Sequence, residues 1–154
     1  MVHLLGEYDC KLDAKGRLAL PAALRKQLGE LEKQGFVLNR DIFEGCLVLY
    51  PNEAWKQVSQ QVSKLNRFVK KNAMFIRRFN NGATPVDSDS AGRINIPPRL
   101  MQYAALGKEV IVSGNGERIE IWDKSKYEAL MNEDIDFASL SEEVMGDQDH
   151  GSEA

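Results

Sequence analysis

The chain has 154 residues, of which 43% are hydrophobic and 28% charged, which is typical of one globular domain or two small ones. Its apolar runs are too short to span a membrane and its start lacks a signal-peptide pattern, so we expect a cytoplasmic protein without a membrane partner. The net charge of −3 conceals an acidic tail, because residues 133–154 hold eight acids and no Lys or Arg. Residues 1–132 keep 20 bases against 15 acids, and this basic body is compatible with a polyanionic partner.

The few cysteines and histidines limit redox and metal chemistry. Cys10 and Cys46 lie in apolar, strand-like segments, which favours two buried thiols over a disulfide. His3 and His150 lie near opposite ends of the chain, so the sequence lacks the ligand spacing of a zinc site. We therefore expect neither a metal nor a cofactor.

The first unit, residues 1–51, has the pattern of strand, turn, strand, short helix and strand pair. A strand over 7–12 leads into the turn "DAKG" (13–16), and Leu18 and Leu20 alternate along the next strand. A short helix follows Pro21 and ends at Gly29, and a hairpin turns at "DIFEG" (41–45).

Residues 52–81 form a helical connection that is expected to break near Asn66. Apolar residues recur along it at helical spacing (Trp55, Val58, Val62, Leu65, Val69 and Ile76). Its bases are Lys64, Arg67, Lys70, Lys71, Arg77 and Arg78. We interpret the stripe as a packed face and the bases as a solvated one; a membrane or partner surface is the alternative.

The second unit, residues 82–131, repeats the first. "DSAGRINIP" (89–97) matches "DAKGRLALP" (13–21) at an offset of 76, and "RIEIWDKSKY" (118–127) matches "CLVLYPNEAW" (46–55) at an offset of 72. The coincident residues are Asp13 and Asp89, Gly16 and Gly92, Arg17 and Arg93, and Pro21 and Pro97. The second short helix is expected to end at Gly107, and a hairpin turns at "GNGE" (114–117).

The acidic tail, residues 132–154, has a weaker pattern. Phe137, Leu140 and Val144 recur at helical spacing among acidic and small residues. This pattern is typical either of a docked acidic helix or of a disordered end.

The stretch "DSDSAG" (87–92) begins like a calcium-binding loop. In that loop, however, the fifth and twelfth positions supply ligands, and here they are Ala91 and Pro98. Asp89 is instead the counterpart of Asp13, and we expect each to shape a turn with the glycine three residues later. Asp87 has no acidic counterpart and receives no role.

The sequence offers little to an enzyme, since it lacks a nucleophile–base pattern and a Gly-rich phosphate loop. A catalytic acid–base pair of Asp13 and Asp89 is the alternative to their role in the turns, and we favour the turns. Arg17 and Arg93 follow the turn glycines, where arginine suits phosphate contacts or the reading of guanine edges. The alternative is that each arginine only braces its own aspartate. Further bases near the turns are Lys15, Lys11, Arg25 and Arg99.

The doubled motif, "DAKGRLALPAALR" and "DSAGRINIPPRL", resembles the MraZ family of bacterial transcriptional regulators, in the swapped-hairpin class typified by AbrB. The resemblance covers roughly residues 1–130 and implies an α+β, β-rich, pseudo-symmetric barrel that both units of one chain build, with helices packed outside. It also implies a ring-shaped homo-oligomer that binds double-stranded DNA at direct repeats upstream of a cell-division and cell-wall gene cluster.

On this resemblance, Arg17 and Arg93 contact DNA with Asp13 and Asp89 beside them, and Lys15 takes the family's basic position. Ala91 replaces that base in the second unit, so the resemblance does not decide whether both units contact DNA equally. The resulting prediction is a cytoplasmic, nucleoid-associated repressor without enzymatic activity. The alternatives are an antitoxin-type regulator whose tail binds a protein partner, and a small enzyme or metal protein.

Overall fold

A computed structural model describes the backbone of residues 2–151 and the side chains of residues 2–146. The first unit comprises β1 (Glu7–Lys11), β2 (Arg17–Ala19), α1 (Ala22–Leu28), the 3-10 helix η1 (Gly29–Gln34), β3 (Phe36–Arg40) and β4 (Leu47–Pro51). The connection contains α2 (Asn52–Ser63) and α3 (Lys70–Asn80). The second unit comprises β5 (Thr84–Val86), β6 (Arg93–Asn95), α4 (Pro98–Tyr103), β7 (Glu109–Asn115), β8 (Arg118–Asp123) and α5 (Lys124–Met131), and α6 (Phe137–Gly151) follows.

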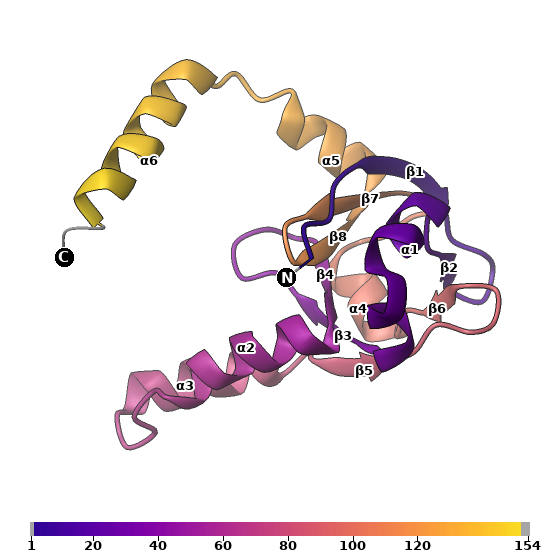
Figure 1. Cartoon of the computed structure of the whole chain (residues 1–154), viewed down its shortest axis with the longest axis horizontal. Helices are drawn as coiled ribbons and strands as arrows, with labels where there is room; N and C mark the ends of the chain where they lie inside the picture. Colours follow the sequence, from indigo (N-terminus) through magenta and orange to yellow (C-terminus); the bar gives the residue numbers. More distant parts are fainter. Residues whose placement is uncertain (1, 152–154) are drawn as a thin grey trace.

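The two units interleave their strands. One sheet has the order β1-β7-β8-β4-β3-β5, and β2 pairs with β6 in a second sheet. Thus β1 of the first unit pairs with β7 of the second, and β5 of the second unit pairs with β3 of the first (Figure 1). All of these pairs are antiparallel. This exchange confirms the predicted α+β fold built from two repeats.

One hydrophobic core lies between the two sheets. Leu18 and Leu20 from the first unit and Ile94 and Ile96 from the second are buried in it, as their alternation predicts. Leu38, Leu49, Val112 and Ile121 reach the same cluster from the larger sheet. Because both units contribute apolar side chains to this one cluster, neither unit has a hydrophobic core of its own.

Of the two predicted glycine ends of the short helices, one is confirmed and one is wrong. Gly29 ends α1 with a positive φ of 56°, as predicted. The prediction that Gly107 ends the second helix is wrong, because α4 stops at Tyr103 and Ala105 adopts the positive φ of 48°. Gly107 instead donates its N–H to Asp123 Oδ1 at 2.9 Å.

The helical connection is a hairpin that projects from the sheets (Figure 1). Its helices break between Ser63 and Lys70, around the predicted Asn66. At its base Trp55 stacks on Phe79, with ring centroids 5.6 Å apart, and Ile76 is buried. The prediction of a wholly packed stripe is wrong at the tip, where Leu65 and Val69 are exposed.

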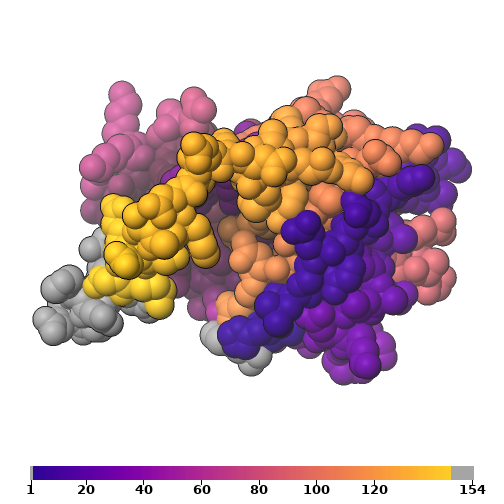
Figure 2. All heavy atoms as spheres, turned by 90° about the horizontal axis from the view of Figure 1, so that it is seen from above, coloured from indigo at the N-terminus to yellow at the C-terminus, as the bar shows by residue number. Residues whose placement is uncertain are grey.

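The tail forms a helix that does not dock on the body. Figures 1 and 2 show α6 as an arm that leaves the body beyond α5. Its apolar side chains Phe137, Leu140 and Val144 are exposed. The alternative of an acidic helix docked on its own chain is therefore wrong, and the tail is helical from Phe137 to Gly151.

Among the helices that the structure describes, none combines the length and the apolar character needed to cross a membrane.

Candidate functional site

The first motif turn is organised by the carboxylate of Asp13. Its Oδ1 accepts the backbone N–H groups of Lys15 and Arg17, both at 2.9 Å. Its Oδ2 accepts Nε–H of Arg17 at 2.7 Å. Gly16 has a φ of 77°, a left-handed conformation that glycine adopts without the Cβ clash.

The second motif turn repeats this geometry. Asp89 Oδ1 accepts the backbone N–H groups of Ala91 and Arg93, both at 2.9 Å, and Oδ2 accepts Arg93 Nε–H at 3.0 Å. Gly92 has a φ of 78°. The change from Lys15 to Ala91 leaves the turn intact, because Asp89 bonds the backbone of Ala91 and needs no side chain there.

Strands β2 and β6 hold the two turns together. Their register pairs Arg17 with Asn95 and Arg93 with Ala19, while the central Leu18 and Ile94 face each other in the core. Side chains alternate along a strand, so both arginines lie on the solvent face. Arg17 and Arg93 are diagonal neighbours, for which the usual separation is about 7–8 Å.

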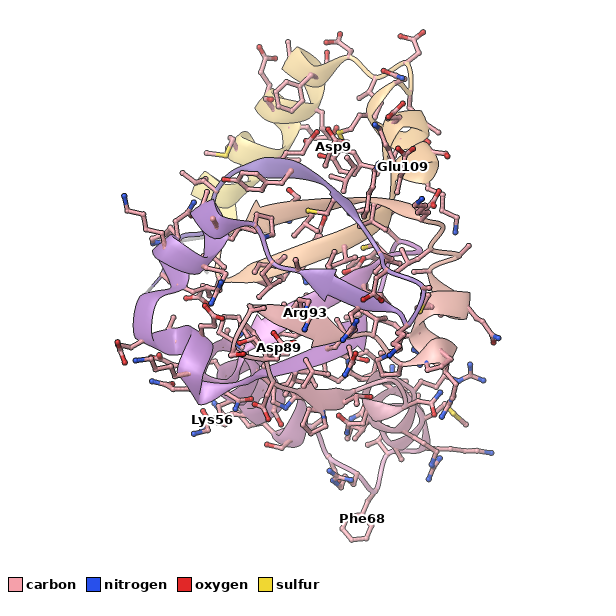
Figure 3. All side chains as sticks on the ribbon, turned by 90° about the vertical axis from the view of Figure 1, so that its right-hand side faces the viewer. Asp9, Lys56, Phe68, Asp89, Arg93 and Glu109 are labelled. Carbon is pink, nitrogen blue, oxygen red and sulfur yellow. The ribbon has the colours of Figure 1, made fainter. Side chains whose placement is uncertain are left out.

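Both turns lie on one side of the molecule, opposite the α2–α3 hairpin (Figure 1). Figure 3 looks onto this side and shows Asp89 and Arg93 near its centre. The backbone closes the arrangement symmetrically, since Leu20 N–H donates to Gly92 O at 2.9 Å and Ile96 N–H donates to Gly16 O at 3.0 Å. Each unit thus supports the turn of the other.

The bonding of the turns keeps the aspartates charged and the arginines available. The backbone N–H of Arg17, with further bonds from the Arg17 side chain and Lys15, lowers the pKa of Asp13 from its ordinary 3.8. The backbone N–H groups of Arg93 and Ala91 and the Arg93 side chain lower the pKa of Asp89 in the same way. Within the described chain, only Nε of each guanidinium bonds a protein acceptor, and the side chains are 32% and 39% exposed. The outer nitrogens of both can therefore reach an anionic ligand.

A third predicted arginine, Arg25, covers the second turn. Its guanidinium bonds Glu32 at 3.1 Å and lies over Gly92, where a Cβ would be 2.5 Å from the guanidinium carbon. The residue in the equivalent place over Gly16 is Met101, whose sulfur would be 3.1 Å from a Cβ. The two turns therefore differ in the side chain that packs over the glycine, which is charged at Gly92 and apolar at Gly16.

The other predicted bases occupy different surroundings. Lys15 is exposed at the tip of the first turn. Lys11 is exposed on β1 opposite Glu109, and Arg99 lines a cavity of about 210 Å³ that Tyr103 also lines. Asp87, which had no predicted role, packs against Gly35, where a Cβ would lie 2.6 Å from its Oδ1.

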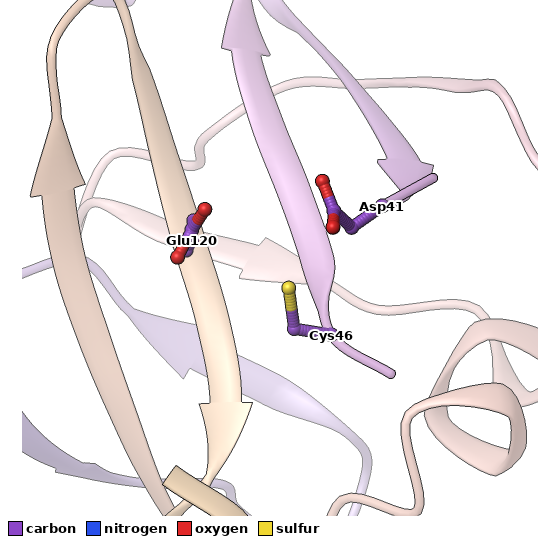
Figure 4. Close-up of side chains that lie close together, drawn as sticks. All are labelled: Asp41, Cys46 and Glu120. Atoms are coloured by element: carbon purple, nitrogen blue, oxygen red, sulfur yellow. The ribbon is translucent and has the colours of Figure 1, made fainter. Parts of the chain in front are cut away.

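A partly buried cluster of two acids and a cysteine was not predicted from the sequence. Asp41, Cys46 and Glu120 come within reach of a shared ion (Figure 4). Arg118 lies between the acids, 3.6 Å from Asp41 Oδ1 and 3.3 Å from Glu120 Oε2, and Trp122 Nε1–H donates to Glu120 at 3.0 Å. Burial first, and then the charge of Glu120 and Asp41, raises the pKa of Cys46.

Arg118 pairs with both acids and Trp122 bonds Glu120, so the cluster is held together as a network of ion pairs and hydrogen bonds. The only signal in the sequence was the alternation of Arg118, Glu120 and Trp122, which places them on one face of β8.

The chain is similar in sequence to proteins of one known family. The family model described as "MraZ protein, putative antitoxin-like" matches twice, over residues 3–78 and 79–147, in agreement with the two interleaved units. A protein named transcriptional regulator MraZ from Christiangramia forsetii is 48% identical, covering 97% of each chain. Its namesake from Flavobacterium psychrophilum is 47% identical over 95% of this chain and 94% of its own. The namesake from Bacteroides thetaiotaomicron is 34% identical over 96% of each chain. The chain belongs to the MraZ family.

Proposed function

We propose that this protein is a transcriptional regulator, of repressing type, that binds double-stranded DNA in a sequence-specific manner through its two motif turns. The observation that carries this proposal is the paired geometry of Arg17 and Arg93. Both guanidiniums are held through Nε, are partly exposed, and lie on one solvent face of the two-stranded sheet. The names of the relatives, each a transcriptional regulator, support the same proposal.

The two arginines suit DNA because fixed guanidiniums bind phosphates or guanine edges with two parallel hydrogen bonds. Lys15 adds a flexible charge at one turn, and the nearby Lys11 and Arg25 contribute to the local positive potential. Arg99 belongs to the same proposed set of DNA-binding bases.

The proposal extends to assembly and target. A ring-shaped homo-oligomer presents several copies of this weakly basic surface, and direct repeats suit a head-to-tail ring better than a palindrome does. We place the target upstream of a cell-division and cell-wall gene cluster, and the protein in the cytoplasm at the nucleoid.

The test is DNA binding as a function of salt concentration, with a fragment that contains direct repeats. Arg17→Ala and Arg93→Ala should each lower the affinity and reduce the salt slope by about one unit per phosphate contact. Arg93→Lys separates charge from geometry, because it should keep the slope and lose about 1–3 kcal/mol of discrimination if the fork reads a base.

Lys56→Ala is the matched control, since Lys56 is exposed on α2 and Figure 3 places it away from Arg93. Unchanged affinity and slope in folded Arg17→Ala and Arg93→Ala proteins would refute the assignment of DNA contacts to the turns. The antitoxin-type alternative places a second protein on the acidic tail, so a tail that becomes ordered only when a protein partner is added would favour that alternative.

A further inference from the structure

The α2–α3 hairpin carries an exposed surface that the proposed DNA site does not use. We call it the hairpin surface. Its exposed apolar side chains are Leu65, Phe68, Val69, Met74 and Phe75, and its bases are Lys64, Arg67, Lys70, Lys71, Arg77 and Arg78. Phe68 is 100% exposed, and Figure 3 shows it at the tip of the hairpin.

Helix α3 concentrates this character. Its sequence, "KKNAMFIRRFN", contains four bases and no acid. Lys70 and Lys71 lie in its first turn, where the helix dipole disfavours positive charge. Beside its last turn, Phe75 and Phe79 line a cavity of about 260 Å³ together with Ile42 and Tyr103. The surface therefore combines apolar side chains, a cavity and uncompensated positive charge.

The tail carries the complementary surface. Phe137, Leu140, Val144 and Met145 are exposed and spaced to lie along one face of α6. The acids around them are Glu133, Asp134, Asp136, Glu142 and Glu143, and no base occurs from residue 133 onward. This tail surface matches the hairpin surface in apolar character and opposes it in charge.

We propose that the tail surface of one chain docks on the hairpin surface of a second copy. In its own chain α6 stands clear of α3 (Figure 1), which leaves both surfaces open. DNA is the less suitable occupant of the hairpin surface, because the exposed side chains of Met74 and Phe75 cannot donate hydrogen bonds to phosphates. The motif turns also lie on the opposite side of the molecule.

The contact joins two different surfaces, so it is heterologous. In a pair of chains, the hairpin surface of one chain and the tail surface of the other remain unoccupied. Repetition of such a contact produces a closed ring or an open filament. The inference rests on the self-association included in the proposed function, and it identifies the elements that make the contact. The core of the contact is apolar and its rim is charged, as in other protein interfaces.

The first experiment measures the mass of the purified full chain by light scattering, without DNA. Lys70→Glu/Lys71→Glu and Glu142→Lys/Glu143→Lys should each shift the wild-type oligomer toward the 17.3 kDa monomer. A chain with all four changes should regain the oligomer, because the charges are again opposite. Lys33→Glu/Lys56→Glu is the control with the same charge change on exposed residues outside the hairpin surface, and it should retain the wild-type mass.

The second experiment identifies which chains touch. Phe75→Cys in ¹⁵N-labelled protein is mixed with Leu140→Cys in unlabelled protein, and the mixture is treated with a short bis-maleimide. A cross-linked product that contains one labelled and one unlabelled chain is expected. The wild type gives the background, because Cys46 is buried and Cys10 partly so. Absence of the mixed product would overturn the inference. So would a chain that carries both Phe75→Cys and Leu140→Cys and forms the cross-link only within itself.

The outcomes separate this inference from the proposed function. An oligomeric wild type whose mass is unaffected by the reversals overturns the docking but leaves the ring and the DNA site standing. A monomeric wild type at all concentrations overturns both the ring and the docking. If Lys70→Glu/Lys71→Glu weakens DNA binding at unchanged mass, α3 binds DNA and the docking is wrong.

Discussion

At each motif turn one carboxylate bonds two backbone amides and one guanidinium nitrogen, so the charge of a single residue fixes the whole loop. The backbone N–H of Arg17 is the main reason that the pKa of Asp13 lies below 3.8, and that of Arg93 acts likewise on Asp89. A depressed pKa in the folded state means stabilisation that is present above the unfolded-state pKa and is lost as pH falls through the folded one. The turns therefore stay ordered at neutral pH and loosen only in acid.

This linkage predicts the carboxyl titrations. In NMR titrations, the midpoints of Asp13 and Asp89 should both lie below 3.8. Arg17→Ala should raise the midpoint of Asp13 only in part, because the backbone amides remain, and it should leave Asp89 unchanged. The second turn is thus the control for the first. An ordinary midpoint for either aspartate would contradict the bonding described for its turn.

The glycines of the two turns should differ in tolerance although their φ angles agree. Alanine at a left-handed position costs about 1–2 kcal/mol, so Gly16→Ala and Gly92→Ala should each lower the free energy of unfolding by at least this much. Gly92→Ala should cost more, because its Cβ would also displace the guanidinium of Arg25 from Glu32, whereas Met101 over Gly16 is flexible. Urea unfolding of both variants measures the difference. Equal losses would show that the Arg25 cover contributes nothing.

At the scale of elements, the repeat made much of the fold predictable. Coincident Asp, Gly, Arg and Pro residues indicated both turns and the short helices after them, and alternating apolar residues indicated which side of β2 and β6 is buried. Periodicity could not show that the hairpin tip and α6 remain exposed, because an apolar stripe looks the same whether or not something covers it. The acidic cluster around Arg118 was also beyond prediction, since pairing of β4 with β8 brings residues of both units together.

The β2–β6 ladder should transmit core packing to the proposed DNA surface. Leu18 and Ile94 are 0% and 1% exposed and pair at its centre. Leu18→Ala should lower the free energy of unfolding by about 2–5 kcal/mol. Its DNA affinity should also fall under conditions where it remains folded, because both arginines lose their support. Asn95→Ala, on the exposed face of the same ladder, should change stability by less than about 0.5 kcal/mol. A Leu18→Ala protein with wild-type stability would contradict the position of the residue in the core.

At the scale of the whole molecule, the proposed DNA surface and the proposed contact between copies occupy opposite sides of the body (Figure 1). This separation allows a chain to bind DNA and its neighbours at once. Binding through one pair of turns is weak when few phosphates are contacted, so the proposed assembly would supply affinity through effective concentration.

This arrangement predicts a dependence on the number of DNA repeats. Wild-type protein should bind a fragment with three direct repeats about 10²-fold or more tightly than a fragment with one. Lys70→Glu/Lys71→Glu should bind the single repeat like wild type, because the motif turns are unchanged, but should lose most of the gain from further repeats.

Altering the spacing between repeats by half a helical turn tests the geometry, since a ring of fixed subunit spacing cannot follow a rotated site. Fluorescence anisotropy at constant salt measures all of these affinities. Equal gains for the variant and the wild type would mean that contacts elsewhere than α3 join the subunits.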